Sequence, residues 1–558
     1  MLNYNAIPHD EEIANAVNVY FPFATANPGQ KEAIFVAVKS IFQGYGHVII
    51  EAPTGTGKSV IATTIHNVLR SFDPTFRTSI TTATKNLQAQ YQRTPKADIY
   101  DLMGKTNYKC PIGCGPYNSP ACRKTVAQKK CTPKHSCPYV IRRMEWTQKA
   151  ALRSTNNSFM IEACTEIICT DATRSDLTIL DESHKVEDHL LDHTTVKIDE
   201  RDLHQVSQLY GDLEIVDKAR EYLSALDEFE VGTVIRVQGR FREALIQLAR
   251  AISEAHERLK GAVEKAKERG VEAPAIIYET ISELQGIEDK AKLFTDTESS
   301  CVIYQEKDVS GLSATIKPVF AADVSEFGLF RKGDHHVHMS ATICGIEEYA
   351  RALGIKNGDY KAIQIDNPIP IENRPIHVVP VVKMTGGLDE QKLNILVHNI
   401  DKIIDSHAGE NGIIHTVSYN LAEKIFERSR HKKKMLVSGK VRDIMDALDS
   451  GSGQRVILSP SIEEGVDLKG NLSRFQIIAK VPYGFLGDPL VKLRSERYPS
   501  SYARTTILRI VQACGRSVRG VDDWAQTYIL DSAFDSLLTR NSELFPEWFK
   551  EAIHFHDV

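Results

Sequence analysis

The stretch "APTGTGKS" (residues 52–59) combines residue types that can hold the phosphates of a nucleotide. Gly55 and Gly57 let the backbone bend so that successive N–H groups face an anion. Lys58 can reach the β- and γ-phosphates, and the Ser59 hydroxyl can ligate Mg²⁺. We therefore expect a nucleotide and Mg²⁺ to bind at a loop formed by Pro53, Thr54, Gly55, Thr56, Gly57, Lys58 and Ser59.

A pair of carboxylates follows later in the chain, in "DLTILDESHKVEDH" (residues 176–189). Asp181 suits ligation of Mg²⁺ through water, and Glu182 suits positioning and deprotonating the water that attacks a phosphate. We expect His184 to couple this pair to the rest of the protein. The alternative interpretation is a solvated turn after a strand, and the phosphate loop upstream disfavours it.

Three further stretches could complete a site of this kind. If residues 504–519 are helical, Gln512, Arg516 and Arg519 lie at i, i+4 and i+7 and share one face. An arginine from a second lobe could then stabilise charge on the γ-phosphate when a cleft closes. The other two stretches are "MSATI", with Ser340, Ala341 and Thr342, and "SPSIEEGVDLKG", with Glu464, Gly465 and Asp467.

A third group of reactive side chains is a cluster of thiols in residues 110–137, which hold five of the ten cysteines with the spacing C-x3-C-x7-C-x8-C-x5-C. This cluster contains no C-x2-C pair, the usual mark of a structural zinc ribbon, so the spacing favours zinc only weakly. His135 is a weaker candidate ligand. Iron–sulfur, zinc and metal-free interpretations all remain open from the spacing alone.

Hydrophobic patterning supplies the elements that must position these residues. Val48–Ile50 and Leu177–Leu180 are short apolar runs typical of buried strands, and Val60–Leu69 has a helical pattern. In an open parallel sheet, ligands bind at the carboxyl ends of the strands, where the loop and the carboxylates would both lie. Residues 203–230 and 239–270 carry apolar residues at helical spacing with charges between them, which predicts amphipathic helices.

The whole chain has the composition of a multidomain globular protein. It has 558 residues, 42% of them hydrophobic and 25% charged, with a net charge of −5. The length suggests three or four domains, and we find no run of about 18 apolar residues that would predict a membrane span. The acidic, mixed N-terminus does not fit a secretory signal, so we expect a reducing cytoplasm, where disulfides are disfavoured. Near-neutral charge leaves nucleic-acid binding open, because phosphate contacts depend on local patches.

Other clusters have simpler interpretations. His335, His336 and His338 lie on or beside a probable strand, and we expect packed or solvated histidines there rather than metal ligands. The cysteines outside the cluster occur in apolar contexts and are expected to be small buried residues: Cys164, Cys169, Cys301, Cys344 and Cys514.

The order of the motifs resembles that of the superfamily 2 helicases, in their XPD-like and DinG-like iron–sulfur branch. Nine motifs occur in the family order: "NPGQKEAI", "APTGTGKS", "TTATKNLQAQY", the cysteine block, "LDESH", "MSAT", "IIHTVSYNLAEKI", "SPSIEEGVDLKG" and "QACGRSVR". The resemblance implies that Gln30 contacts adenine and that Thr84, Lys85 and Asn86 contact DNA phosphates. Ser183 and Ala533 depart from the usual family residues at their positions, and neither touches the expected chemistry directly.

The resemblance also implies an α/β architecture with two RecA-like parallel-sheet P-loop lobes and two insertions. We expect lobe one at residues 1–104, 141–188 and 316–355, an iron–sulfur domain at 105–140, a helical arch at 189–315 and lobe two at 356–558. A [4Fe–4S] cluster needs four thiolates. By resemblance the ligands would be Cys110, Cys122, Cys131 and Cys137, with Cys114 spare or exchanging roles with Cys110, and with Zn²⁺ as the alternative metal.

The implied activity is that of an ATP-dependent DNA helicase moving 5′→3′ on single-stranded DNA. The expected partners are single-stranded DNA and forked or R-loop DNA, for a monomeric protein without a membrane partner. Its setting would be the cytoplasm of a bacterium or a phage-infected cell, in DNA repair or replication. Two alternatives are a translocase that strips RNA or protein from DNA, and a nucleic-acid-binding protein with a vestigial ATPase.

Overall fold

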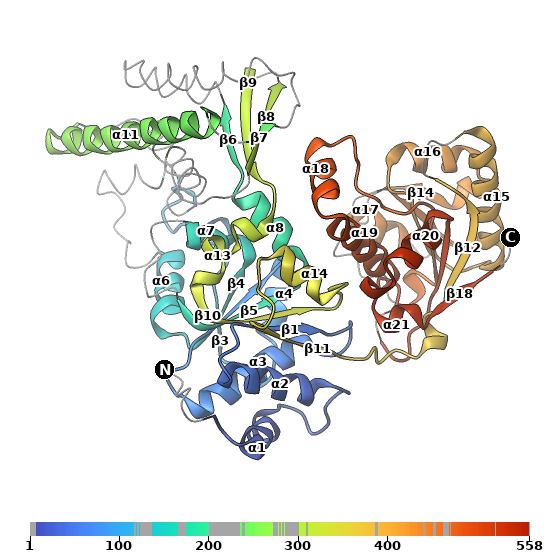
Figure 1. The fold of residues 1–558 in the computed structure, drawn as a ribbon, viewed down its shortest axis with the longest axis horizontal. Coiled ribbons are helices and arrows are strands. Elements are labelled where there is room, and N and C mark those ends of the chain that lie inside the picture. Colours follow the sequence, from blue (N-terminus) through green and yellow to red (C-terminus); the bar gives the residue numbers. More distant parts are fainter. Residues whose placement is uncertain are drawn as a thin grey trace.

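The structure is a computed structural model of the chain, shown in Figure 1. It describes residues 7–116, 119, 122, 137–165, 174–199, 235–236, 240–271, 277, 281, 284, 301–308, 311–384, 389–438, 441–449, 453–460, 468, 470–518 and 520–556. Two α/β lobes lie side by side, and a further unit with a long helix projects from the first lobe (Figure 1). The predicted two-lobe α/β class is confirmed.

Lobe one is built on a parallel seven-stranded sheet with the order β11-β1-β10-β5-β2-β4-β3. Its central strands β1, β10 and β5 are near-continuous runs of buried residues, as parallel strands covered on both faces require. The strands are β1 (His47–Glu51), β2 (Thr78–Thr82), β3 (Ile99–Asp101), β4 (Leu152–Asn156), β5 (Ser175–Asp181), β10 (Gly333–Ser340) and β11 (Tyr360–Gln364).

Helices cover both faces of this sheet and form two apolar cores. One core contains buried side chains of α1, α2 and α3, and the other contains those of α7, α8 and α14. These helices are α1 (Asp10–Tyr20), α2 (Gln30–Phe42), α3 (Lys58–Phe72), α7 (Asn157–Thr165), α8 (Val186–His193) and α14 (Ile346–Ala352). The predicted strands at Val48–Ile50 and Leu177–Leu180 and the predicted helix at Val60–Leu69 are confirmed.

Lobe two repeats this architecture with a second parallel seven-stranded sheet, in the order β14-β15-β13-β16-β17-β12-β18. The strands are β12 (Ile376–Val382), β13 (Gly412–His415), β14 (Met435–Val437), β15 (Val456–Ser459), β16 (Phe475–Ile478), β17 (Gln526–Asp531) and β18 (Ile553–Phe555). The helices are α15 (Glu390–Ser406), α16 (Tyr419–Arg428), α17 (Val441–Asp449), α18 (Pro489–Arg497), α19 (Pro499–Cys514), α20 (Ala533–Arg540) and α21 (Glu547–Lys550). α15 and α16 pack into one core, and α19, α20 and α21 pack into another.

The expected end of lobe one at residue 355 is too early. Strand β11 pairs in parallel with β1, with Tyr360 opposite His47 and Gln364 opposite Glu51. It therefore belongs to the first sheet. Its residues are mostly exposed or half-buried because it is an edge strand, so it lacks the continuous apolar run that marks a buried strand.

The insertion expected to be a helical arch contains a sheet as well. Helix α11 (Arg240–Glu268) confirms the helix predicted at 239–270, whereas the one predicted at 203–230 lies outside the described residues. An antiparallel sheet in the order β6-β9-β8-β7 joins β6 (Val196–Asp199), β7 (Ile235–Arg236), β8 (Cys301–Asp308) and β9 (Gly311–Pro318). The insert therefore combines a sheet with helix α11. Strands β6 and β7 pair with partners far away in sequence, through contacts that helical periodicity does not reveal.

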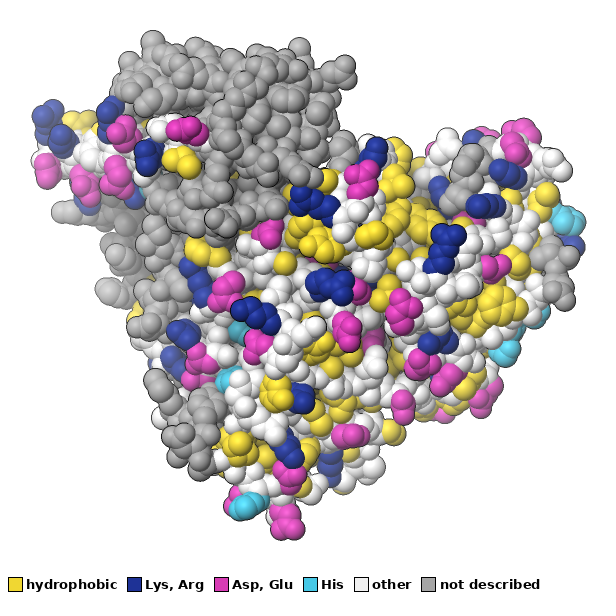
Figure 2. All heavy atoms as spheres, in the orientation of Figure 1, with side chains coloured by type: hydrophobic (Ala, Val, Ile, Leu, Met, Phe, Trp, Pro, Cys, Tyr) yellow, Lys and Arg dark blue, Asp and Glu magenta, His cyan; other side chains and the backbone are white. Residues whose placement is uncertain are grey.

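Charged residues of both signs cover the molecule. Figure 2 shows Lys and Arg side chains interspersed with Asp and Glu over both lobes on the face drawn. None of the helices in the described part of the chain combines the length and apolar character needed to cross a bilayer.

Candidate functional site

The phosphate loop lies between β1 and α3, as its sequence predicts. Gly55 has φ 90° and Gly57 has φ 79°, a region of backbone conformation that favours glycine. The Thr56 hydroxyl donates to the Pro53 carbonyl at 2.8 Å and closes the turn. Helix α3 then begins at Lys58, so its first N–H groups face the concave side of the loop, where an anion is favoured.

Gln30 holds this loop through its side-chain amide. Its Nε2 donates to the Thr56 carbonyl at 2.7 Å, and its Oε1 accepts from the Asn27 backbone N–H at 2.7 Å. A Cβ added to Gly57 would lie 2.5 Å from the Gln30 Nε2, so a larger residue there would displace the amide that holds the loop. In this structure the buried Gln30 amide positions the loop, and its expected contact with adenine remains a prediction.

Asp181 stands at the carboxyl end of β5, where a magnesium ligand was expected. Its Oδ2 accepts a hydrogen bond from the Tyr91 hydroxyl at 3.0 Å, and its Oδ1 accepts from the Glu182 N–H at 3.0 Å. Burial and repulsion from Glu182 raise the pKa of Asp181 to about 6, although the charge of Lys58 opposes the shift. A buried carboxylate beside a second carboxylate favours a cation.

The donor set fits magnesium. A Ser59 hydroxyl at the start of α3 and the Asp181 carboxylate at the end of β5 supply oxygen ligands, which Mg²⁺ prefers. Asp181 interacts electrostatically with Glu182 and Lys58. A divalent cation bound at Asp181 would relieve the repulsion from Glu182 that raises the Asp181 pKa. These observations support Ser59 and Asp181 as the residues that would hold the ion.

Glu182 is joined to the "MSAT" stretch through His184. The Glu182 Oε2 lies 3.4 Å from His184 Nδ1, and the same nitrogen lies 2.7 Å from the Ser340 hydroxyl. Ser340 in turn donates to the Thr342 carbonyl at 2.9 Å. Glu182 itself has φ 52°, an unusual backbone conformation for a residue other than glycine. His184 therefore contacts both Glu182 and Ser340, and its coupling role stays a prediction.

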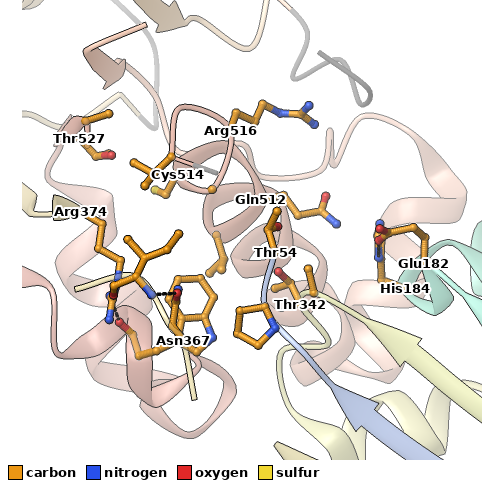
Figure 3. Close-up of a pocket in the computed structure, with 18 of the residues that line it drawn as sticks. Thr54, Glu182, His184, Thr342, Asn367, Arg374, Gln512, Cys514, Arg516 and Thr527 are labelled. Atoms are coloured by element: carbon orange, nitrogen blue, oxygen red, sulfur yellow. Dashed lines mark hydrogen bonds and ion pairs between the residues drawn. The ribbon is translucent and has the colours of Figure 1, made fainter. Parts of the chain in front are cut away.

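The two lobes together line a cavity of about 470 Å³. Lobe one contributes Pro53, Thr54, Thr84, Asn86, Glu182, His184, Ala341 and Thr342, and lobe two contributes Val511, Gln512, Cys514, Gly515, Arg516 and Thr527. Gln512, in the last turn of α19, and Arg516, just after it, lie on the side of the cavity where Glu182 and His184 lie, whereas Asn367 and Arg374 lie at the other end (Figure 3). Of the residues expected to act on a γ-phosphate, Glu182, Gln512 and Arg516 line this cavity.

The predicted helix over 504–519 is wrong at its end, because α19 stops at Cys514. In a longer helix the Cys514 carbonyl would accept from residue 518, but it accepts instead from the Gln476 side chain at 2.7 Å. Gly515, a poor helix former, follows directly. Gln512 and Arg516 both line the cavity without sharing a helix face, and Arg519 lies outside the described residues.

The lobes also contact each other beside the site. Arg504 of α19 is 2% exposed, and its guanidinium binds the Glu187 carboxylate of α8 at 2.6 Å and the Ile343 carbonyl at 3.3 Å. Arg494 of α18 donates to the Val319 carbonyl at 2.6 Å. Lobe two is thereby fixed to the elements that directly follow the "DESH" and "MSAT" stretches.

The expected DNA-contact residues lie at the lobe-one side of the cleft. Thr84 caps helix α4 (Lys85–Tyr91), accepting from the Leu87 N–H. Thr84 and Asn86 line the cavity, and the Lys85 ammonium donates to the Asn107 side chain at 2.8 Å. Contact with DNA stays a prediction for all three.

Four of the five clustered cysteines are described, and Cys131 and His135 are not. The Cys110 and Cys114 sulfurs lie 3.2 Å apart. Desolvation and hydrogen bonding with Cys110, followed by charge and hydrogen-bond interactions with Cys122, raise the pKa of Cys114 to about 12. Cys114 therefore sits among expected ligands, which agrees with an exchange of roles between Cys110 and Cys114. As placed, the described side chains contain no group of three or more His, Cys, Asp or Glu arranged to hold a metal.

Of the other predicted groups, the strand histidines are packed. His336 and His338 are buried, and burial holds their pKa values well below the ordinary range. Cys344 is also buried, as expected. Glu464, Gly465 and Asp467 lie outside the described residues.

Three functional neighbours were not predicted: Tyr91, Glu187 and Arg504. Tyr91 ends the "TTATKNLQAQY" motif, but its spacing in the helix is that of a core residue. The only feature of the sequence that could have pointed to a role in the site is its hydroxyl group. Glu187 and Arg504 are charged residues in amphipathic helical segments, and their pairing crosses 317 residues of sequence. A single sequence contains no sign of such a contact.

Comparisons with known proteins agree with this geometry. The family described as "Helicase C-terminal domain" matches residues 400–552, and the one described as "Type III restriction enzyme, res subunit" matches residues 24–205. The ATP-dependent DNA helicase DinG of Photobacterium profundum is 23% identical over an alignment of 217 residues that covers 35% of this chain and 31% of that protein. The chain thus matches about a third of the length of this curated relative.

Solved structures show the same fold. An XPD helicase matches with a TM-score of 0.60 and 14% identity, covering 96% of this chain and all of that one. S. tokodaii Xpd4 matches with a TM-score of 0.57 and 15% identity, covering 95% of this chain and all of that one. These likenesses show the fold, which has two RecA-like lobes. The resemblance to XPD-like and DinG-like helicases, predicted from motif order, is confirmed.

Proposed function

We propose that this protein is an ATP-dependent DNA helicase that translocates 5′→3′ on single-stranded DNA. The observation that carries the proposal is the cavity lined by Thr54 and Glu182 of lobe one together with Gln512 and Arg516 of lobe two. ATP bound in this cavity would contact both lobes at once. The relative named as an ATP-dependent DNA helicase supports the same activity.

Each residue of the site has a role in this proposal. The N–H groups of residues 55–59 and the Lys58 ammonium would hold the phosphates, and Gln30 would keep the loop in shape. Ser59 and Asp181 would hold Mg²⁺, which when bound neutralises charge on the β- and γ-phosphate oxygens. Glu182 would orient the attacking water and accept its proton, while His184 relays the state of this carboxylate to Ser340.

Lobe two would complete the site. Gln512 and Arg516, with Arg519 beside them in sequence, would stabilise charge on the γ-phosphate when the cleft closes. Glu464, Gly465 and Asp467 would meet the nucleotide from the same lobe. The Arg504–Glu187 contact supports this coupling, because movement of lobe two must pull on the helix that follows Glu182.

The nucleic acid would lie along the lobe-one edge of the cleft, contacted by Thr84, Lys85 and Asn86. Single-stranded DNA and forked or R-loop DNA are the proposed substrates, for a monomeric chain acting in repair or replication in the bacterial cytoplasm. Because the two lobes belong to one chain, each cycle of cleft closure and opening would move the protein one step along the DNA.

We also propose a [4Fe–4S] cluster bound by Cys122, Cys131 and Cys137 together with Cys110, or with Cys114 in its place. The 3.2 Å separation of the Cys110 and Cys114 sulfurs supports an exchange between these two ligands. Anaerobically purified protein should be brown, with about four irons per chain, the content of one cubane. Colourless protein with stoichiometric zinc would show the alternative metal.

Strand displacement on two tailed duplexes tests the helicase proposal. One duplex would carry only a 5′ single-stranded tail and the other only a 3′ tail of equal length. We expect ATP-dependent unwinding of the 5′-tailed duplex alone. Unwinding of the 3′-tailed duplex would reverse the polarity, and ATP-driven removal of a bound protein without unwinding would show the translocase alternative.

A further inference from the structure

Helix α4 connects two parts of the proposed machinery that have separate tasks. Its first residues are the expected DNA contacts, and its last residue, Tyr91, touches the expected magnesium ligand. The helix has 7 residues, which corresponds to about 10 Å at 1.5 Å per residue. A single rigid element of this length moves as a unit.

Tyr91 is placed to fix the carboxylate of Asp181. Its ring is 1% exposed and packs in the apolar core of lobe one. Its hydroxyl donates to one carboxylate oxygen, while the Glu182 N–H donates to the other. Two donors on different oxygens set the plane of the carboxylate and leave further lone pairs of both oxygens for a metal-bound water.

Packing alone does not require this hydroxyl. A phenylalanine ring would fill the same core volume without the cost of burying a hydroxyl, a cost that only a hydrogen bond offsets. Among the hydrogen bonds of the described residues, the partner of the Tyr91 hydroxyl is Asp181. The hydroxyl thus acts on the carboxylate at the centre of the proposed site.

We propose that Tyr91 is a positioning residue that orients Asp181 for magnesium and links this ligand to nucleic acid held at the start of α4. The inference rests on the proposed function, since it takes Asp181 as the magnesium ligand and residues 84–86 as DNA contacts. Binding of DNA at one end of α4 would hold the hydroxyl on Asp181, so DNA would favour the metal-loaded nucleotide.

The test is the variant Tyr91→Phe, which keeps the ring and removes one hydrogen bond. Binding of a fluorescent ADP analogue, titrated with MgCl₂, measures the Mg²⁺ requirement without any turnover. We expect the half-saturating Mg²⁺ concentration to rise about tenfold, the factor that loss of one hydrogen bond to a charged group produces. Affinity for the analogue in EDTA should not change.

A matched control is Tyr502→Phe, which removes a hydroxyl that donates to the Gly484 carbonyl at 2.8 Å in lobe two. This variant should titrate like the wild type. With an oligo-dT strand present, the wild-type Mg²⁺ requirement should fall, and that of Tyr91→Phe should not, because the link is gone.

A double-variant cycle guards against a general folding effect. In an Asp181→Asn background, Tyr91→Phe should have no further effect on nucleotide affinity if it acts through Asp181. Equal Mg²⁺ requirements in wild type and Tyr91→Phe would overturn the inference while leaving the proposed function intact. A wild-type chain that binds no Mg²⁺–nucleotide would overturn both.

Discussion

Asp181 and Asp531 each lie at the carboxyl end of a parallel strand, one in each lobe, but their surroundings differ. Each ends a strand of a parallel seven-stranded sheet, β5 in lobe one and β17 in lobe two. Asp531 is fully buried and accepts backbone N–H groups of Met384, Val481 and Ala533 at 2.9–3.1 Å. Its carboxylate ties together three segments of lobe two.

Asp181 has fewer donors and more charge around it. It accepts one backbone N–H and the Tyr91 hydroxyl, and it faces Glu182 and Lys58. The same residue type at the carboxyl end of a strand thus ties segments together in lobe two and lies beside other charged groups in lobe one. On the proposed function, Asp181 of lobe one would hold the metal ion, and lobe two would close over the site and complete it.

The largest expected effect is loss of turnover from a change in lobe one. Lys58→Ala and Asp181→Asn should each lower ATP hydrolysis by about 10³-fold or more, because each removes a group that meets the developing charge. The melting temperature of the nucleotide-free protein should not fall. ATPase assays and thermal unfolding measure the two quantities; intact turnover in Lys58→Ala would refute the assignment of the loop.

The contact between the lobes gives the next prediction. Arg504→Met should lower stability by about 3 kcal/mol, because it leaves the partly buried Glu187 carboxylate without its partner. The first thermal transition reports the change. The double variant Arg504→Met/Glu187→Gln should recover part of the loss, since the unpaired charge is gone. Equal destabilisation in the single and double variants would show that the ion pair does not hold the lobes together.

Asp531→Asn is the matched control for Asp181→Asn and should affect stability rather than chemistry. An amide nitrogen in place of Oδ2 cannot accept the Val481 N–H, so we expect a loss of about 2 kcal/mol. At a temperature where the variant is folded, its ATP turnover should stay within a few-fold of wild type. A larger loss of turnover than in Asp181→Asn would reverse the comparison between the lobes.

The smallest expected effect is a pH dependence of ATP turnover that arises from Asp181 in lobe one. The raised pKa of Asp181, about 6, means that its proton is retained below that pH, where the neutral acid no longer attracts Mg²⁺. We expect kcat/KM for ATP to fall about tenfold from pH 8 to pH 5. Protonation of the buried Asp181 carboxyl also adds to the free energy of unfolding. This contribution is present at acid pH and is lost as pH rises through about 6. Added Mg²⁺ should shift the acid-side fall in kcat/KM to lower pH. A fall that does not shift with Mg²⁺ would show that another group is being protonated.

The sequence revealed the elements with local signals. The phosphate loop, the strand before Asp181, the helix from Lys58 and the two-lobe class were all predictable, because glycine positions and apolar runs encode them. The end of α19 was not, since a side chain from β16 captures the Cys514 carbonyl. Strands β6 and β7 of the arch and strand β11 of lobe one depend on pairing with distant segments.

The site was predictable in its parts and not in its connections. Lys58, Asp181, Glu182, Gln512 and Arg516 were named from motifs, and the structure brings Glu182, Gln512 and Arg516 to one cavity. The contacts that link those parts, from Tyr91 to Asp181 and from Arg504 to Glu187, cross 90 and 317 residues. Motif spacing contains no information on contacts of that range.

The most direct test of the account is ATP hydrolysis by the full chain with and without single-stranded DNA. If lobe two closes over chemistry held in lobe one, and DNA spanning the cleft favours closure, DNA should raise kcat at least about tenfold. The variant Arg516→Ala should lose this stimulation and still bind nucleotide. Hydrolysis at the same rate with and without DNA would contradict the account.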